Sequence, residues 1–300
     1  MNIQDERRIK IAVQKSGRLT EHSLDLLTRC GLLFSRGKRQ LICYGENMPL
    51  DVLLVRDDDI PALIQEGVCD LGFVGQNIVE ERRLSLLEDG DEVCFEQILA
   101  LGFGHCRLSF GIPESMQFDD VSALHGMSIA TTYPAIVGDY LRRHGVEASL
   151  VKFSGAVEIA PSLGKADVVC DLVSSGSTMR AHHLREAVTI LDSEAVVIGR
   201  TNANHVNGAW MDRLMQRIKG VLQVRESKYI MLHAPRAALP RISELLPGSE
   251  APTIIPLEGR DDRVALHAVC RENVFWETLE QLKEAGASSM LVLPVEKMLA

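Results

Sequence analysis

The chain has 300 residues, of which 46% are hydrophobic and 24% are charged, and its formal net charge is −9 at pH 7. This composition is typical of a globular protein of roughly two or three domains, and the acidic balance without a Lys/Arg cluster argues against nucleic acid as a partner. No apolar run approaches the ~20 residues of a membrane span, and the charged stretch MNIQDERRIKIAV lacks the apolar core of a secretion signal.

The seven cysteines are scattered, odd in number and form no CxxC pair, and the nine histidines show no metal-ligand spacing. This pattern predicts reduced thiols in a cytoplasmic protein and no structural metal.

The first hundred residues alternate strand and helix signals. Strands are expected at 9–13, 51–55 and 70–74, and helices at 20–30 and from a first turn that contains Pro61 up to Gly67. This rhythm predicts a mostly parallel sheet that is covered on both faces.

A second alternating block spans residues 107–177. Strands are expected at 108–112, 128–131, 149–153 and 168–171, and a helix at 135–144. Residues 188–199 resemble a single strand that returns to the first block, and 211–219 a helix that leads to a boundary near Arg225.

The tetrapeptide VCDL occurs twice, at 68–71 and 169–172. Each copy is followed by a glycine four residues after its leucine. This repeat predicts two lobes of similar β/α construction, with Asp70 and Asp171 at equivalent strand ends that face one cleft. A chance match of four residues is the alternative.

The remaining 75 residues follow a βαββαβ order, the split ferredoxin-like pattern. Strands are expected at 228–234, 253–256, 263–270 and 290–293, and helices at 236–246 and 273–285.

The segment ADVVCDLVSSGSTM (166–179) contains a strand, a Ser/Gly/Thr-rich turn and the start of a helix. Backbone amides and hydroxyls gathered in this way suit a phosphate group, and the residues concerned are Ser174, Ser175, Gly176, Ser177 and Thr178. Asp171, at the strand end, is placed to receive sugar hydroxyls or a Mg²⁺ ion held by the same ligand. An ordinary turn and helix cap without a ligand is the alternative.

Other strand-to-helix junctions carry charged or aromatic residues. Lys15 and Arg18 lie beside a glycine and suit a polyphosphate, and a solvated turn is the alternative. Arg56 stands at the end of the next strand and is placed to join the same rim, or to form a surface ion pair with the acidic residues 57–59. Tyr133 is placed to stack on a base or to close the cleft, and packing at a helix entry is the alternative. Glu158 is placed to contact a ligand, or only to complement a helix dipole.

Four motifs resemble ATP phosphoribosyltransferase of histidine biosynthesis: VRDDDIP (55–61), CDLGFVG (69–75), SGAVEIAP (154–161) and above all DLVSSGST (171–178). Three tail motifs resemble the long form of that enzyme, which carries its own regulatory domain: RESKYIMLHAP (225–235), APTIIPL (251–257) and GASSMLVLPVEKM (286–298). The resemblance covers essentially the whole chain, in order.

The resemblance implies an α/β fold with a bilobal catalytic core similar to periplasmic binding proteins, followed by a ferredoxin-like, ACT-like regulatory domain. The expected units are lobe I at 1–100 and 182–224, lobe II at 101–181, and the regulatory domain at 225–300. The implied reaction is ATP plus phosphoribosyl pyrophosphate giving N1-phosphoribosyl-ATP and pyrophosphate, with Mg²⁺ as cofactor. Histidine is the implied feedback inhibitor, and the implied assembly is a homo-oligomer, from dimer to hexamer.

Roles for individual residues follow from the resemblance together with the motifs. The phosphate turn and Asp171 are expected to bind phosphoribosyl pyrophosphate, and Asp171 and Glu158 to be catalytic. The Mg²⁺ ion is expected to be held mainly by substrate, with Asp171 as its candidate protein ligand. The residues expected to line the ATP site are Lys15, Arg18, Arg56, Asp70, Tyr133 and Glu158. The residues expected at the histidine site are His233, Ala251 and Thr253.

Three rival interpretations remain on sequence alone. They are a solute-binding module, a non-catalytic sensor or scaffold, and a phosphoribosyltransferase for another base.

Overall fold

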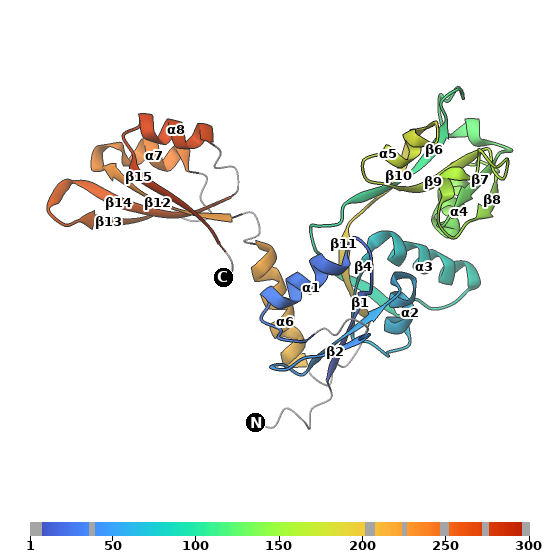
Figure 1. Cartoon of the computed structure of the whole chain (residues 1–300), viewed down its shortest axis with the longest axis horizontal. Coiled ribbons are helices and arrows are strands. Elements are labelled where there is room, and N and C mark those ends of the chain that lie inside the picture. The colour runs from blue at the N-terminus through green and yellow to red at the C-terminus, as the bar shows by residue number, and fades with distance from the viewer. Residues whose placement is uncertain are drawn as a thin grey trace. The chain divides into compact units, whose positions relative to one another are not determined.

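The computed structural model describes residues 8–35, 40–201, 208–223, 227–246, 252–271 and 276–295. The chain divides into two compact units, Met1–Met211 and Asp212–Ala300, and the larger unit holds two separate sheets (Figure 1). Within the described ranges, the helices are all too short or too polar to cross a membrane.

The first lobe is built on a six-stranded sheet in the order β2-β3-β1-β4-β11-β5. Its strands are β1 (Ile9–Gln14), β2 (Ile42–Tyr44), β3 (Leu50–Val55), β4 (Leu71–Gly75), β5 (Phe95–Ala100) and β11 (Ala195–Arg200), and its helices are α1 (Thr20–Arg29), η1 (Asp57–Asp59), α2 (Ile60–Gln65) and α3 (Gln76–Asp89). Strands β3, β1 and β4 are parallel, whereas β2, β11 and β5 each run antiparallel to a neighbour. The sheet is therefore mixed rather than mostly parallel, because β11 enters from the second lobe against the direction of β4.

The second lobe is built on a five-stranded mixed sheet in the order β10-β6-β9-β7-β8. Its strands are β6 (Cys106–Pro113), β7 (Ser128–Thr131), β8 (Ser149–Lys152), β9 (Val168–Val173) and β10 (Leu184–Ser193), and its helices are η2 (Val121–Leu124), α4 (Pro134–Arg143), η3 (Val157–Ile159) and α5 (Ser177–Ala181). Strands β9, β7 and β8 are parallel, so their carboxyl ends share one edge.

The expected return strand at 188–199 is two strands. Strand β10 pairs with β6 in the second sheet, and β11 pairs with β4 and β5 in the first. The expected assignment of residues from 182 onward to lobe I is therefore wrong for β10. The chain changes sheets at Glu194, between the two strands.

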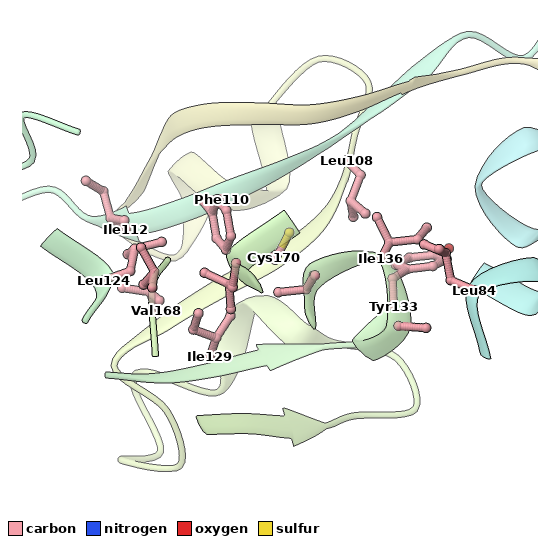
Figure 2. Packing of buried hydrophobic residues seen from close by; sticks show 14 residues of the cluster. Leu84, Leu108, Phe110, Ile112, Leu124, Ile129, Tyr133, Ile136, Val168 and Cys170 are labelled. Atoms are coloured by element: carbon pink, nitrogen blue, oxygen red, sulfur yellow. The ribbon is translucent and has the colours of Figure 1, made fainter. Parts of the chain in front are cut away.

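The core of the second lobe follows from alternation along its central strand. Leu108, Phe110 and Ile112 of β6 are completely buried on one face of the sheet, where they pack with Ile129 and Val168 from neighbouring strands (Figure 2). Ser109 and Arg107 alternate with them and lie on the other face, so a single strand supplies both the core and a polar layer.

A seam between helices α3 and α4 joins the two lobes. Asn77, Ser193 and Tyr133 form a buried network, in which Ser193 Oγ donates to Asn77 Oδ1 (2.9 Å) and Asn77 Nδ2 donates to Tyr133 Oη (3.0 Å). Glu81 of α3 accepts from the first free amides of α4, those of Ala135 and Ile136, both at 2.9 Å. A carboxylate of one lobe thus caps a helix of the other.

Asn77→Ala is expected to lower the free energy of unfolding by about 1–3 kcal/mol for each buried hydroxyl that loses its partner. Chemical unfolding monitored by circular dichroism measures the loss. Asn47→Ala is the matched control, because Asn47 also uses its amide twice, toward Gly31 and Leu33, but is exposed to water that replaces the lost bonds. Equal losses for the two variants would contradict a special role for the buried network.

The smaller unit contains a four-stranded antiparallel sheet in the order β13-β14-β12-β15. Its strands are β12 (Ser227–Pro235), β13 (Thr253–Leu257), β14 (Arg260–Arg271) and β15 (Ser288–Pro294); its helices are η4 (Arg236–Ala238), α7 (Leu239–Leu245) and α8 (Trp276–Glu284), and α6 (Gly208–Gln223) precedes the sheet. Helices α7 and α8 cover one face of the sheet (Figure 1), where Ile230 and Leu232 pack against Ile242 and Leu282. The expected βαββαβ pattern is confirmed.

Candidate functional site

The candidate site lies where loops at the carboxyl ends of parallel strands from the two lobes meet. In the first lobe the loops follow β1 and β3; in the second they follow β7, β8 and β9. Open α/β sheets bind ligands at this edge. A direct contact joins the loops, because Arg18 Nη1 of the first lobe donates to Ser174 Oγ of the second.

The turn at 174–178 has the geometry of a phosphate loop. Gly176 has φ +72°, in the left-handed region, and a Cβ there would come within 2.9 Å of Arg180 Nη1. The Ser175 and Ser177 hydroxyls are 2.9 Å apart, and the Ser177 amide points toward Ser175 Oγ. Ser174, Ser175 and Thr178 are exposed, so their hydroxyls lie at the protein surface.

Three arginines hold this turn. Besides Arg18, Arg107 Nη1 donates to the Ser174 carbonyl (3.3 Å) and Arg180 Nη2 donates to the Ser175 carbonyl (3.1 Å). They come from the first lobe, from β6 and from α5, so the positive charge converges from separate elements on one turn. Such a turn favours an anion with several oxygen atoms.

Asp171 lies beside this turn, on β9. The pKa of its carboxyl is raised to about 6: burial is the main cause and the charge of Glu158 adds to it, while the Leu172 amide (2.8 Å) and the charge of Arg18 oppose the shift. The charges of Glu158 and Arg18 thus both act on Asp171. A raised carboxyl pKa at a junction of loops is typical of a functional site.

Glu158 is placed on η3, after a turn in which Ala156 has a left-handed φ of +49°. Its side chain is half-buried. The charge of Glu158 thus acts on Asp171, from a short 3-10 turn rather than from the expected helix.

The cations expected in the first lobe are exposed at the carboxyl edge. Lys15 follows β1, with its amide bonded to the Val55 carbonyl (2.8 Å), and Arg56 follows β3. Gln14 Nε2 donates to Asp57 (3.0 Å) and fixes the two loops together.

Asp70 does not join this site. Its carboxylate accepts from the Lys10 amide (2.8 Å) before the start of β4, at the amino edge of the sheet. The two VCDL copies have different registers, because β4 begins at Leu71, after the first aspartate, whereas Asp171 is the fourth residue of β9. The expected equivalence of Asp70 and Asp171 is therefore wrong.

Tyr133 is a core residue in this structure rather than a free stacking platform. Its side chain is 8% exposed, and it packs with Leu84 and Ile136 (Figure 2). Burial raises the pKa of its hydroxyl, which is held by Asn77. The packing alternative given by the sequence agrees with this placement.

Three further cations near the site belong to none of the sequence motifs described above. Arg107 and Arg180 hold the phosphate turn, and Lys152 ends β8 at the same edge. Burial raises the pKa values of Glu81 and Asp58 in the first lobe, and the charge of Lys152 opposes both shifts. For Lys152, the sequence offers one signal, which is its position near the carboxyl end of the strand expected at 149–153.

The residues expected at the histidine site lie in the smaller unit. His233 on β12 is half-buried and Thr253 on β13 is exposed, while Ala251 lies outside the described residues. Through β14, Thr253 pairs with His267 and His233 pairs with Ala265. Both therefore lie on the sheet face opposite the helices.

Comparison with known proteins gives two family matches that together span most of the chain. Residues 56–220, more than half of the chain, match the family described as ATP phosphoribosyltransferase, and residues 225–297 match the family described as "HisG, C-terminal domain".

Comparison with solved structures supports the bilobal fold. The ATP phosphoribosyl transferase (HisG:HisZ) complex from Thermotoga maritima aligns with a TM-score of 0.61 at 21% identity, covering 72% of this chain and 98% of that one. The periplasmic VFT2 domain of Bordetella pertussis BvgS aligns with a TM-score of 0.45 at 15% identity, covering 74% and 94%, too weakly to support an argument. On the evidence of the family match, the chain belongs to the ATP phosphoribosyltransferase family.

Proposed function

We propose that the protein transfers the phosphoribosyl group of phosphoribosyl pyrophosphate to N1 of ATP, with release of pyrophosphate, as the first step of histidine biosynthesis. The observation that best supports this function is the turn at 174–178, which three arginines hold next to Asp171. It offers a phosphate-binding turn and a carboxylate side by side, as a phosphorylated sugar requires.

The turn is proposed to bind the 5-phosphate, and Asp171 to accept hydrogen bonds from the ribose hydroxyls. A hydrogen bond to a charged group contributes roughly 1.5–3 kcal/mol, so three or four such bonds anchor the sugar firmly. The anchored sugar then presents C1 to the gap between the lobes.

The reaction needs no covalent enzyme intermediate. The N1–C1 bond forms as the C1–O bond to pyrophosphate breaks, and the leaving group keeps the electron pair. The protein contributes orientation and charge. Lys15, Arg18 and Arg56 are proposed to hold phosphates of ATP and pyrophosphate, and Glu158 to face the ribose side.

The donor set near the turn fits a Mg²⁺ ion that is held mainly by substrate. In the described ranges, His, Cys, Asp and Glu side chains never gather in threes as a metal cage would need. Asp171, with Glu158 nearby, offers one or two carboxylates, and Mg²⁺ commonly binds through such a pair together with substrate phosphates. When bound, the ion would stabilise negative charge on the departing pyrophosphate.

The smaller unit is proposed to bind histidine as a feedback inhibitor, and the chain to assemble as a homo-oligomer in the cytoplasm. The match of residues 225–297 to the C-terminal domain family supports the regulatory role.

The function is tested by measuring pyrophosphate release from ATP plus phosphoribosyl pyrophosphate and Mg²⁺, with and without histidine. Release that requires both substrates supports the proposal. Binding of ligand without turnover would instead indicate a solute-binding module, and turnover with another base but not with ATP would indicate a different phosphoribosyltransferase.

Gly176→Ala is expected to raise the KM for phosphoribosyl pyrophosphate about tenfold. A Cβ at this left-handed position adds backbone strain of about 1 kcal/mol and crowds Arg180, which fixes the turn. Gly164→Ala is the control, because its φ is +63° but a Cβ there meets no atom within 4 Å. Equal KM values for the two variants would contradict a role of the turn in binding.

A further inference from the structure

A polar network lies on the sheet behind the phosphate turn. Arg107 and Glu186 form a bidentate ion pair, Nε to Oε1 and Nη2 to Oε2, both at 2.5 Å. Ser109 Oγ donates to Glu186 Oε1 (2.7 Å) and lies 3.0 Å from Thr189 Oγ1. The third guanidinium nitrogen of Arg107, Nη1, takes no part in the ion pair and donates to the Ser174 carbonyl.

Strand register explains why these residues meet. Arg107 and Ser109 alternate along β6, so both project from the face opposite the apolar core. The pairing of β10 with β6 shifts between Glu186 and Val188, and this irregularity brings Glu186 and Thr189 beside Ser109. On the other side of β6, Ser109 pairs with Asp171 of β9. The network and Asp171 therefore share one face of the sheet.

The ion pair is better suited to orientation than to stability. Its side chains are 35% and 27% exposed, and partly exposed ion pairs add little to folding. A guanidinium held by a carboxylate through two bonds has its plane fixed, however, and so has the direction of its third nitrogen.

We propose that Arg107 and Glu186 are positioning residues of the phosphate turn: Glu186 orients Arg107, whose Nη1 fixes the Ser174 carbonyl so that the hydroxyls and amides of the turn face the substrate phosphate. This inference rests on the proposed function, because it assigns to the turn the 5-phosphate of the sugar. Neither residue touches the reacting atoms.

The inference is tested with Glu186→Gln and Arg107→Lys. Gln keeps the shape of Glu186 but leaves an amide where the second carboxylate oxygen was, and Lys keeps the charge of Arg107 but loses the fork. Both variants are expected to raise the KM for phosphoribosyl pyrophosphate about tenfold, with the KM for ATP within twofold of wild type. Isothermal titration with ribose 5-phosphate is expected to show the same tenfold loss of affinity.

The pair Arg83–Glu80 supplies the matched control. It has the same bidentate geometry, Nε to Oε2 at 2.8 Å and Nη2 to Oε1 at 2.7 Å, and both of its residues lie on helix α3 of the first lobe. Glu80→Gln and Arg83→Lys are expected to leave both KM values within twofold. A purely structural role for Arg107–Glu186 would lower the melting temperature and leave the KM for phosphoribosyl pyrophosphate unchanged, which would overturn the inference.

The two measurements separate failure of the inference from failure of the function. A wild-type protein that binds ribose 5-phosphate but releases no pyrophosphate would overturn the proposed reaction, and the affinity loss in the variants would still support the positioning role. A wild-type protein that releases pyrophosphate from both substrates but does not bind ribose 5-phosphate would leave the proposed reaction standing and overturn the positioning role, because the turn would not hold the 5-phosphate. If one variant fails to fold, the other still tests the inference, because Glu186→Gln changes the acceptor of the bidentate ion pair and Arg107→Lys changes its donor.

Discussion

Asp171→Asn is expected to lower kcat/KM by about 100-fold to 1,000-fold and, at the same time, to make the folded protein more stable above pH 7. The loss of activity follows from the proposed bonds between the carboxylate and the ribose hydroxyls, each contributing roughly 1.5–3 kcal/mol. Asn can still accept from the Leu172 amide, as Asp171 does, so local backbone structure is expected to persist.

The gain in stability follows from the sign of the pKa shift. Burial raises the pKa of Asp171 from 3.8 to about 6, so the folded state binds more protons than the unfolded state between these values and stability falls as pH rises. Ionised Asp171 therefore opposes folding above pH 6. The shift in pKa corresponds to about 3 kcal/mol of lost folding free energy. This is an upper limit, because the side chain is not fully buried. Urea unfolding at pH 8 and pH 4 measures the difference between wild type and variant, which is expected to shrink at the lower pH.

Asp167→Asn is the matched control, at the residue before the same strand. Asp167 precedes β9 at the opposite edge, where hydrogen bonds from the Ser128 amide and hydroxyl lower its pKa. Its neutralisation is expected to destabilise the protein and to leave turnover unchanged. Full activity in Asp171→Asn would remove Asp171 from the site, and an unchanged stability at pH 8 would contradict the cause given for its pKa.

The fold was predictable where local pattern and environment agree. The apolar runs of the sequence predict strands β1, β3, β7 and β9. The sequence pattern does not predict helix α3, because this helix lies between the lobes: Leu84 packs into the second lobe, whereas Val79 and Leu86 pack into the first. A helix buried on several sides lacks the single apolar stripe that predicts a surface helix.

The junction of β10 and β11 escapes prediction for a different reason. Residues 184–200 contain no Pro, and their first glycine is Gly199, so nothing local marks the change of sheet at Glu194. Only the tertiary pairing with β6 and β4 divides the run.

The candidate site was predictable in its turn motif but not in its supports. Ser174, Gly176 and Asp171 follow from the pattern of a strand and a polar turn. Arg107 and Glu186 do not, because each looks like an ordinary exposed residue of an antiparallel strand. The error at Asp70 has the same origin, since four matching letters do not fix where a strand begins.

Removal of residues 224–300 is expected to abolish inhibition by histidine while the remaining chain still turns over substrate. The cut follows α6 and leaves intact the compact unit Met1–Met211, which contains every residue proposed to bind the substrates. Initial rates at increasing histidine measure the effect. Inhibition that survives the cut would place the effector site elsewhere.

Full-length variants test the same effector site without altering assembly by deletion. His233→Ala changes the sheet face opposite α7 and α8, and is expected to raise the histidine concentration for half-inhibition at least tenfold with basal turnover unchanged. Glu244→Ala is the control, because Glu244 lies on α7, is exposed and pairs with Arg241 on the same helix. Similar inhibition of the two variants would exclude the open sheet face around His233. Loss of inhibition in His233→Ala but not in Glu244→Ala would place the histidine site in the smaller unit, because neither substitution changes a residue proposed to bind the substrates.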